Sequence, residues 1–325
     1  MHDEPITRNQ GFSLLELTCA MALLLIVGGT ALYALAVYQR TYSGNAVRQN
    51  MQSSVRTATE LLQQEIGQAG AFTGVGGAST VTITAPVSIS PSATAQSVTL
   101  TSTTGMFVGE NLQVDLGTNQ ETVAITSITG STIKAVFTNS HTPPTVVNLA
   151  GIIPFGVMYG QTVGVPTSDG THLYLIGDLN SDGNLYYAAY TCTQSNTPPN
   201  FGTLTRSIKL LPATTLAAAD TDTLVQNVTT NPDGSACFQY QTTSVTVFGA
   251  TYTVVTGVGL TLSTSSSQPD PQIPHTSGAA WPSGYLTVTN SFLNLSPRNI
   301  LYGVNLATAG SSNGLQSLPP TSYYP

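Results

Sequence analysis

Charged side chains are scarce in this chain. Of its 325 residues only 7% are charged, and 15 acidic residues outnumber 8 basic ones, which gives a formal net charge of −7. Nucleic-acid binding depends on clustered positive charge, so no direct nucleic-acid binding is expected. The other polar residues are mostly Thr, Ser, Asn and Gln, which suit short strands and turns better than exposed helices. We therefore expect a chain rich in β-structure.

Sequence motifs of catalysis and of metal binding are also lacking. The chain has no Cys-x-x-Cys pair, no Walker sequence and no Gly-x-Gly-x-x-Gly that opens a helix. Residues 310–314 fit Gly-x-Ser-x-Gly, but no histidine follows them to complete a hydrolase triad. The sequence predicts no enzymatic activity and no cofactor. We expect the four histidines, which lack metal-ligand spacing, at the surface or in turns: His2, His141, His172 and His275.

An uncharged apolar segment follows a short polar leader. Residues 17–38 carry no charge, and ~22 residues of helix span a hydrocarbon layer of ~30 Å. Glu16 stands at the start of this segment, where an ionised side chain is costly unless a partner neutralises it, so we interpret it as functional. The alternatives are a plain signal anchor with Glu16 among the lipid headgroups, and a secretory signal peptide, which would have a basic start and a shorter apolar core.

The sequence Gly11-Phe12-Ser13-Leu14-Leu15-Glu16, followed by an apolar helix, resembles the N-terminus of type IV prepilins and type II secretion pseudopilins. The resemblance implies that prepilin peptidase cleaves between Gly11 and Phe12 and methylates the new N-terminal residue. It also implies that Glu16 pairs with the N-terminal amine of a neighbouring subunit during assembly. The leader departs from the usual basic pattern of the family because it combines Arg8 with two acidic residues, Asp3 and Glu4.

The chain is expected to divide into a leader, a long helix and a head. The leader comprises residues 1–11, and the pilin helix comprises residues 12–72, with its transmembrane part at about 14–38. The second half of the helix is amphipathic, because apolar residues recur at steps of three and four: Met51, Val55, Ala58, Leu62, Ile66 and Ala69. Gly28 and Gly29 interrupt the first half, either for close helix packing or as a point that unwinds on assembly.

Residues 73–325 form the expected β-rich globular head. Short alternating runs between about 95 and 150 predict an inserted small β module, and the Ser/Asn/Gly/Pro-rich C-terminal tail predicts a loosely held strand or coil. The predicted fold class is therefore α+β: a long N-terminal pilin helix, half transmembrane and half amphipathic, packed on the head. Three segments of the chain resemble PilW-type minor pilins, at residues 61–72, 173–206 and 294–299.

Two further features of the head carry expectations. Asp178, Asn180 and Asp182 match the first half of an EF-hand calcium loop, but position twelve is Ala189, so a hairpin turn is the alternative to a weak Ca²⁺ site. Cys192 and Cys237 can form a disulfide in an oxidising compartment, the alternative being two separate buried thiols.

These observations predict a structural subunit of a type IV pilus-like filament, a minor pilin acting at the tip or in priming. The alternatives are a type II secretion minor pseudopilin and an adhesin whose inserted module binds a surface. The family implies several partners: other pilin subunits, prepilin peptidase, the inner membrane and the assembly platform. It also implies a single-pass inner-membrane protein that moves to a periplasmic or cell-surface pilus after processing.

Overall fold

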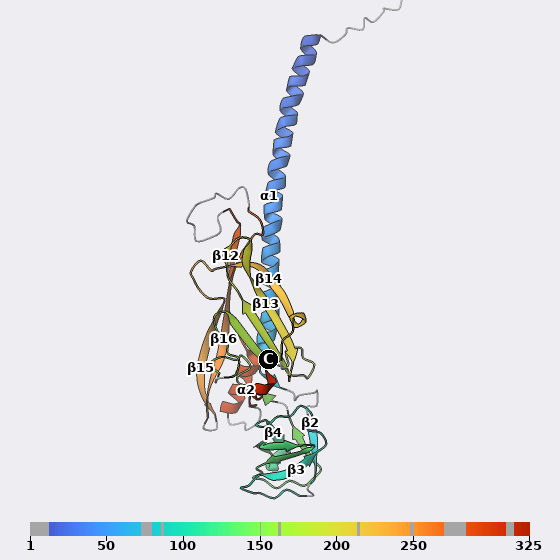
Figure 1. The fold of residues 1–325 in the computed structure, drawn as a ribbon, viewed down its shortest axis with the longest axis vertical. Helices are drawn as coiled ribbons and strands as arrows, with labels where there is room; N and C mark the ends of the chain where they lie inside the picture. Colours follow the sequence, from blue (N-terminus) through green and yellow to red (C-terminus); the bar gives the residue numbers. More distant parts are fainter. Residues whose placement is uncertain are drawn as a thin grey trace, which may run out of the picture. The chain divides into compact units, whose positions relative to one another are not determined.

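The computed structural model describes residues 13–72, 80–85, 88–149, 151–161, 164–212, 215–247, 250–269, 284–309 and 315–325. A long helix, α1 (Leu14–Gln68), precedes a series of antiparallel strands and a second helix, α2 (Arg298–Thr308) (Figure 1). The predicted α+β class is confirmed. The chain forms two compact units, Met1–Asn50 and Met51–Pro325, which we describe in turn.

The first unit contains the apolar part of α1. The helix is continuous through Gly28 and Gly29, and no other part of the unit comes within 4 Å of a side-chain position there. None of the most apolar 18-residue window is buried, and its mean hydropathy of 2.2 makes it long and apolar enough to cross a membrane. Such a surface requires lipid or other apolar helices around it.

The second unit is built around a large antiparallel sheet. Its strands follow the order β10-β11-β13-β14-β16-β15, with β12 paired to β13 and β17 paired to β16. The bounds of its strands are β10 (His172–Gly177), β11 (Tyr186–Cys192), β12 (Asn196–Thr197), β13 (Asn200–Leu210), β14 (Thr221–Thr229), β15 (Phe238–Val247), β16 (Ala250–Ser265) and β17 (Thr287–Leu295).

The second half of α1 packs against this sheet (Figure 1). Its apolar residues recur once per turn and so share one face of the helix. Five of them are no more than 2% exposed and join sheet residues in one core: Val55, Ala58, Leu62, Ile66 and Ala69. The helix ends at Gln68, and Gly70 just after it has φ +82° and donates its N–H to the carbonyl oxygen of Ile176 at 2.8 Å. A left-handed glycine after the last turn is the usual C-terminal stop, and a Cβ here would lie 2.6 Å from the oxygen of Ile153.

Seven short strands form a second, smaller sheet with its own apolar core. Their order is β5-β4-β8-β2-β3-β7-β6, and β5 leads directly into β6, so the two ends of the order are joined and the sheet curls. The bounds are β2 (Thr80–Ala85), β3 (Gln96–Leu100), β4 (Asn111–Val114), β5 (Glu121–Ala124), β6 (Ser127–Thr129), β7 (Thr132–Ala135) and β8 (Thr145–Asn148).

The small sheet includes more of the chain than the predicted module at about 95–150. It begins at Thr80 because β2 lies in its centre, between β8 and β3. The sequence between β2 and β3 contains Pro91 and polar residues, which indicate a loop. The prediction therefore placed the start of the module after this loop and left β2 outside it.

Two other regions complete the second unit. β1 (Ala71–Phe72) pairs with β9 (Gly151–Ile152), so the chain leaves for the small sheet and returns from it at adjacent positions. The prediction of a loosely held strand or coil for the C-terminal tail is wrong for residues 300–308, which belong to α2; Ile300 and Val304 are buried against the core. The short 3₁₀ helices are η1 (Gly117–Asn119), η2 (Ala218–Asp220) and η3 (Thr321–Tyr323).

Candidate functional site

The first turn of α1 carries Glu16, the residue expected to act in assembly. Gly11 and Phe12 lie outside the described residues, whereas Glu16 lies in the first helical turn and is exposed. A carboxylate at this position interacts favourably with the positive end of the helix dipole. Leu14 and Leu15, which precede it, are 80% and 73% exposed. Within the described part of the chain its carboxylate has no cationic partner.

The two threonine hydroxyls of the apolar segment are satisfied within the helix. The hydroxyl groups of Thr18 and Thr30 donate to the carbonyl oxygens of Leu15 and Val27, at 2.8 and 2.9 Å. Hydroxyl groups bonded in this way do not present unpaired donors to hydrocarbon. Cys19 is a free, exposed cysteine in the same segment. Apart from Glu16, this surface therefore suits an apolar environment.

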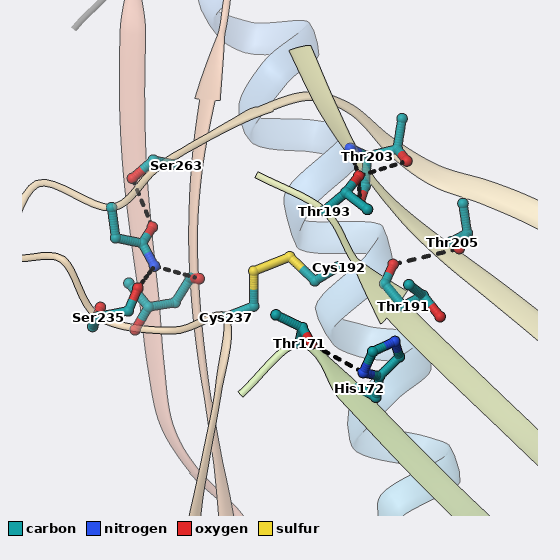
Figure 2. The surroundings of a disulfide bond; sticks show 12 residues. Thr171, His172, Thr191, Cys192, Thr193, Thr203, Thr205, Ser235, Cys237 and Ser263 are labelled. Atoms are coloured by element: carbon teal, nitrogen blue, oxygen red, sulfur yellow. Dashed lines mark hydrogen bonds between the residues drawn. A yellow bond between two sulfur atoms is a disulfide. The ribbon is translucent and has the colours of Figure 1, made fainter. Parts of the chain in front are cut away.

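A disulfide joins Cys192, at the end of β11, to Cys237, which immediately precedes β15 (Figure 2). Both residues are at most 1% exposed, and their Cα atoms are 6.4 Å apart. Hydrogen bonds flank the bond, from the N–H of Phe238 to the oxygen of Gly170 at 3.0 Å and from the hydroxyl of Tyr240 to the oxygen of His172 at 2.7 Å. Because β10 and β15 stand at opposite ends of the strand order, these contacts close the large sheet on itself.

The acidic loop between β10 and β11 is a hydrogen-bonded turn. The carboxylate of Asp178 accepts the backbone N–H groups of Asp182 and Gly183 at 3.0 and 3.1 Å. The carboxylate of Asp182 accepts the hydroxyl of Tyr186 at 2.7 Å. In the described part of the chain no group of three or more His, Cys, Asp or Glu is placed to hold a metal ion. The contacts support the turn interpretation, and a calcium titration of thermal unfolding would decide whether Asp178, Asn180 and Asp182 bind Ca²⁺.

A buried polar cluster fastens α1 to the large sheet. Glu65 is 2% exposed; its carboxylate accepts the hydroxyl of Tyr190 at 2.5 Å and forms an ion pair with the guanidinium of Arg206. Burial, followed by the charge of Glu65, raises the pKa of Tyr190 well above its ordinary value. Burial would lower the pKa of Arg206, but the hydrogen bond and charge of Glu65 outweigh it and the pKa is raised. In the cluster Tyr190 therefore keeps its proton and Arg206 its positive charge.

A second buried cluster lies in the small sheet. The imidazole of His141 contacts Asp115 at 3.1 Å through Nδ1 and Glu121 at 2.6 Å through Nε2. The prediction of a surface or turn position is wrong for His141, which is 1% exposed. Burial would raise the pKa of Glu121, but hydrogen bonds from Thr138 and His141 outweigh it and the pKa is lowered. The imidazole thus connects two carboxylates and ties the strands of the module together.

Comparison with known proteins identifies the N-terminal region. Residues 6–32 match the family model of the prokaryotic N-terminal methylation motif, the prepilin signal of type IV pilins and pseudopilins. No curated protein and no solved structure matches the chain. The motif implies processing by prepilin peptidase and association with other pilin subunits, and it indicates a structural subunit rather than an enzyme. The N-terminal region thus carries the prepilin signal that type IV pilins and pseudopilins share.

Proposed function

We propose that the chain is a minor subunit of a type IV pilus-like filament that acts at the tip or in priming. One observation carries the proposal: the methylation motif at residues 6–32 extends into an apolar helix with no buried residue in its most apolar window, and Glu16 is the one charged residue between Leu14 and Tyr38. The helix anchors the unassembled protein in the inner membrane. After cleavage between Gly11 and Phe12, it packs among the helices of the filament and the head faces outward.

Glu16 registers each incoming subunit in this mechanism. Its carboxylate and the α-amine of Phe12 in a neighbouring subunit would each be stranded in an apolar environment without the other. The two charges can pair only when the helices have one particular axial offset, and pairing removes the cost of leaving each charge alone in an apolar environment. Apolar packing supplies most of the adhesion between helices, and the ion pair selects the register.

The two-sheet head favours a minor role over that of the repetitive major subunit. A type II secretion minor pseudopilin shares the same N-terminus and is the alternative within the family. A second candidate function is adhesion through the small sheet, because apolar side chains near it are exposed. Leu116 is 72% exposed and Val146 is 46% exposed, and a hydrogen bond from the N–H of Asp115 to the oxygen of Val146 places them in adjacent segments.

Replacement of Glu16 tests the assembly role. Glu16→Ala should leave the protein in the membrane but reduce its amount in sheared filaments by ~10-fold or more, because the amine of the neighbour loses its partner in an apolar environment. Immunoblotting of filament and membrane fractions measures the effect, with the intact mass confirming removal of residues 1–11. Glu60→Ala is the matched control, since Glu60 is an exposed carboxylate on the same helix. Normal incorporation of Glu16→Ala would contradict the registry role.

Deletion of the small sheet separates assembly from adhesion. Deletion of residues 80–148 keeps the pairing of Phe72 with Gly151, at which the chain leaves and returns, but it also removes Phe107, which packs on Phe72. Loss of surface binding with normal piliation supports the adhesin, and loss of pili supports the assembly role. The double variant Leu116→Ser/Val146→Ser keeps the module and alters its exposed apolar side chains. We expect pili to be retained in it and surface binding to fall if the small sheet is adhesive.

A further inference from the structure

The C-terminal segment 315–325, which we call the strap, contacts one turn of the small sheet. The side chain of Gln316 is 5% exposed and bonds both backbone groups of Asn111, accepting its N–H at 3.0 Å and donating to its oxygen at 2.6 Å. The same amide donates to the oxygen of Leu149 at 3.0 Å, and the amide of Asn111 donates to the oxygen of Leu315 at 2.8 Å. The backbone and the side chain of Asn111 are therefore both hydrogen-bonded to the strap.

Aromatic contacts also connect the strap to the large sheet. The ring of Phe107 meets that of Tyr323 at 5.9 Å and that of Phe72 at 6.3 Å. The next strap residue, Tyr324, packs on Tyr187 of β11 at 5.9 Å. The N–H of Gln316 donates to Ile152 in β9 at 2.8 Å. The strap thus connects the turn at residues 107–111 with elements outside the small sheet.

Glu110 lies inside this turn and has too few partners for a buried anion. It is 1% exposed; Oε2 accepts the N–H of Phe107 at 3.1 Å, and Oε1 is buried without a hydrogen-bond partner among the described residues. No Lys, Arg or His in that part of the chain forms an ion pair with it. A buried carboxylate with a single hydrogen bond is costly, whereas the neutral acid is tolerated.

The titratable groups around the turn do not compensate a charge on Glu110. The strap contributes Tyr323 and Tyr324, and β11 contributes Tyr187; burial raises the pKa of each. The charge of Glu110 is a further cause for Tyr323. In the small sheet, Asp115 and Glu121 are partnered by His141. Burial raises the pKa of Glu110 to about 8, although the N–H of Phe107 opposes the shift.

We propose that the strap is a pH-responsive clamp, which holds the turn at residues 107–111 while Glu110 is protonated and is released when Glu110 ionises. In the clamped state Glu110 is buried and keeps its proton, and in the released state it meets water and ionises at its ordinary pKa. The clamped state is therefore fully favoured below about pH 4.5, and this advantage is lost as the pH rises toward about 8. The opening constant should rise by about tenfold per pH unit within that window and level off above it. This inference does not depend on the proposed filament role.

Hydrogen exchange on the full chain in detergent tests the clamp. Exchange would be followed by mass spectrometry at pH 6, 7 and 8 and corrected for intrinsic rates. Peptides covering residues 107–114 and 315–325 should lose about tenfold protection per pH unit, while peptides around Glu65 and Tyr190 report the core. In Glu110→Gln, an uncharged isostere, protection of the strap should be high and independent of pH.

Gln316→Ala is the companion variant, because it removes the amide that grips Asn111 without changing Glu110. Its strap peptides should exchange rapidly at pH 6 as well as at pH 8. Three results would overturn the proposal: strap protection in the unmodified chain that does not change with pH, the same pH slope in Glu110→Gln, or a parallel loss of protection around Glu65 and Tyr190, which would mean global rather than local opening.

Discussion

Glu65→Ala is expected to lower the free energy of unfolding of the head by about 3–5 kcal/mol, the range for removing one partner of a buried ion pair. The substitution leaves the guanidinium of Arg206, whose side chain is 13% exposed, without its carboxylate. It also removes the acceptor of the Tyr190 hydroxyl, which burial keeps protonated. One substitution therefore leaves a charged group and a buried hydroxyl group without their partner at the point where α1 meets β11 and β13.

Two control variants separate the components of this effect. Tyr190→Phe removes the hydroxyl alone and should cost about 1 kcal/mol, as for a single buried hydrogen bond. Glu60→Ala breaks an ion pair with Arg56 on the same helix. The side chain of Glu60 is 62% exposed and that of Arg56 is 79% exposed, so the free energy of unfolding should change little. Urea unfolding of the full chain in detergent, followed by the far-ultraviolet β signal, provides the measurement. If Glu65→Ala unfolded at the same urea concentration as Glu60→Ala, the buried cluster would not fasten the helix to the sheet.

The sequence was informative wherever a feature depends on neighbouring residues. The apolar steps from Val55 to Ala69 predicted the buried face of α1, because residues three and four apart share a helical face. The predicted helix end, residue 72, lies four residues beyond Gln68, after which Gly70 supplies the left-handed stop. Alternation of apolar and polar residues located strands of the small sheet, whose apolar positions are buried on one face. The prepilin signal was recognisable for the same reason, since its residues are contiguous.

Features that join distant segments could not be predicted in this way. Glu65 and Arg206 are separated by 141 positions, and no local pattern pairs them. One signal was available, because Glu65 lies three residues after Leu62 on the apolar face, where an unpaired carboxylate would not be tolerated. His141 had no comparable signal, since its partners Asp115 and Glu121 belong to other segments. The prediction of a strand or coil after residue 299 rested on the serine, glycine and proline residues farther along the tail. The local signal for α2 was present, because Ile300, Val304 and Ala307 recur at helical spacing and are buried.

Removal of the disulfide by Cys192→Ala/Cys237→Ala is expected to destabilise the head by about 4 kcal/mol. The two cysteines are separated by 45 positions, and a cross-link that closes a loop of this length removes that much conformational entropy from the unfolded chain in the loop-entropy model. In the folded chain the bond joins the end of β11 to the start of β15, so closure of the large sheet would then depend on the hydrogen bonds of Phe238 and Tyr240.

Chemical reduction provides an independent test of the same bond. Urea unfolding of the unsubstituted chain should shift to lower urea in reductant by as much as in the double variant, and the double variant should not respond to reductant. Cys19→Ala is the matched control, because Cys19 is free and exposed in α1 and should leave the unfolding curve of the head unchanged. Peptide mass mapping without reduction should recover Cys192 linked to Cys237. Equal stability with and without reductant would show that the bond does not hold the two ends of the sheet together, and the closure would then be attributed to the hydrogen bonds alone.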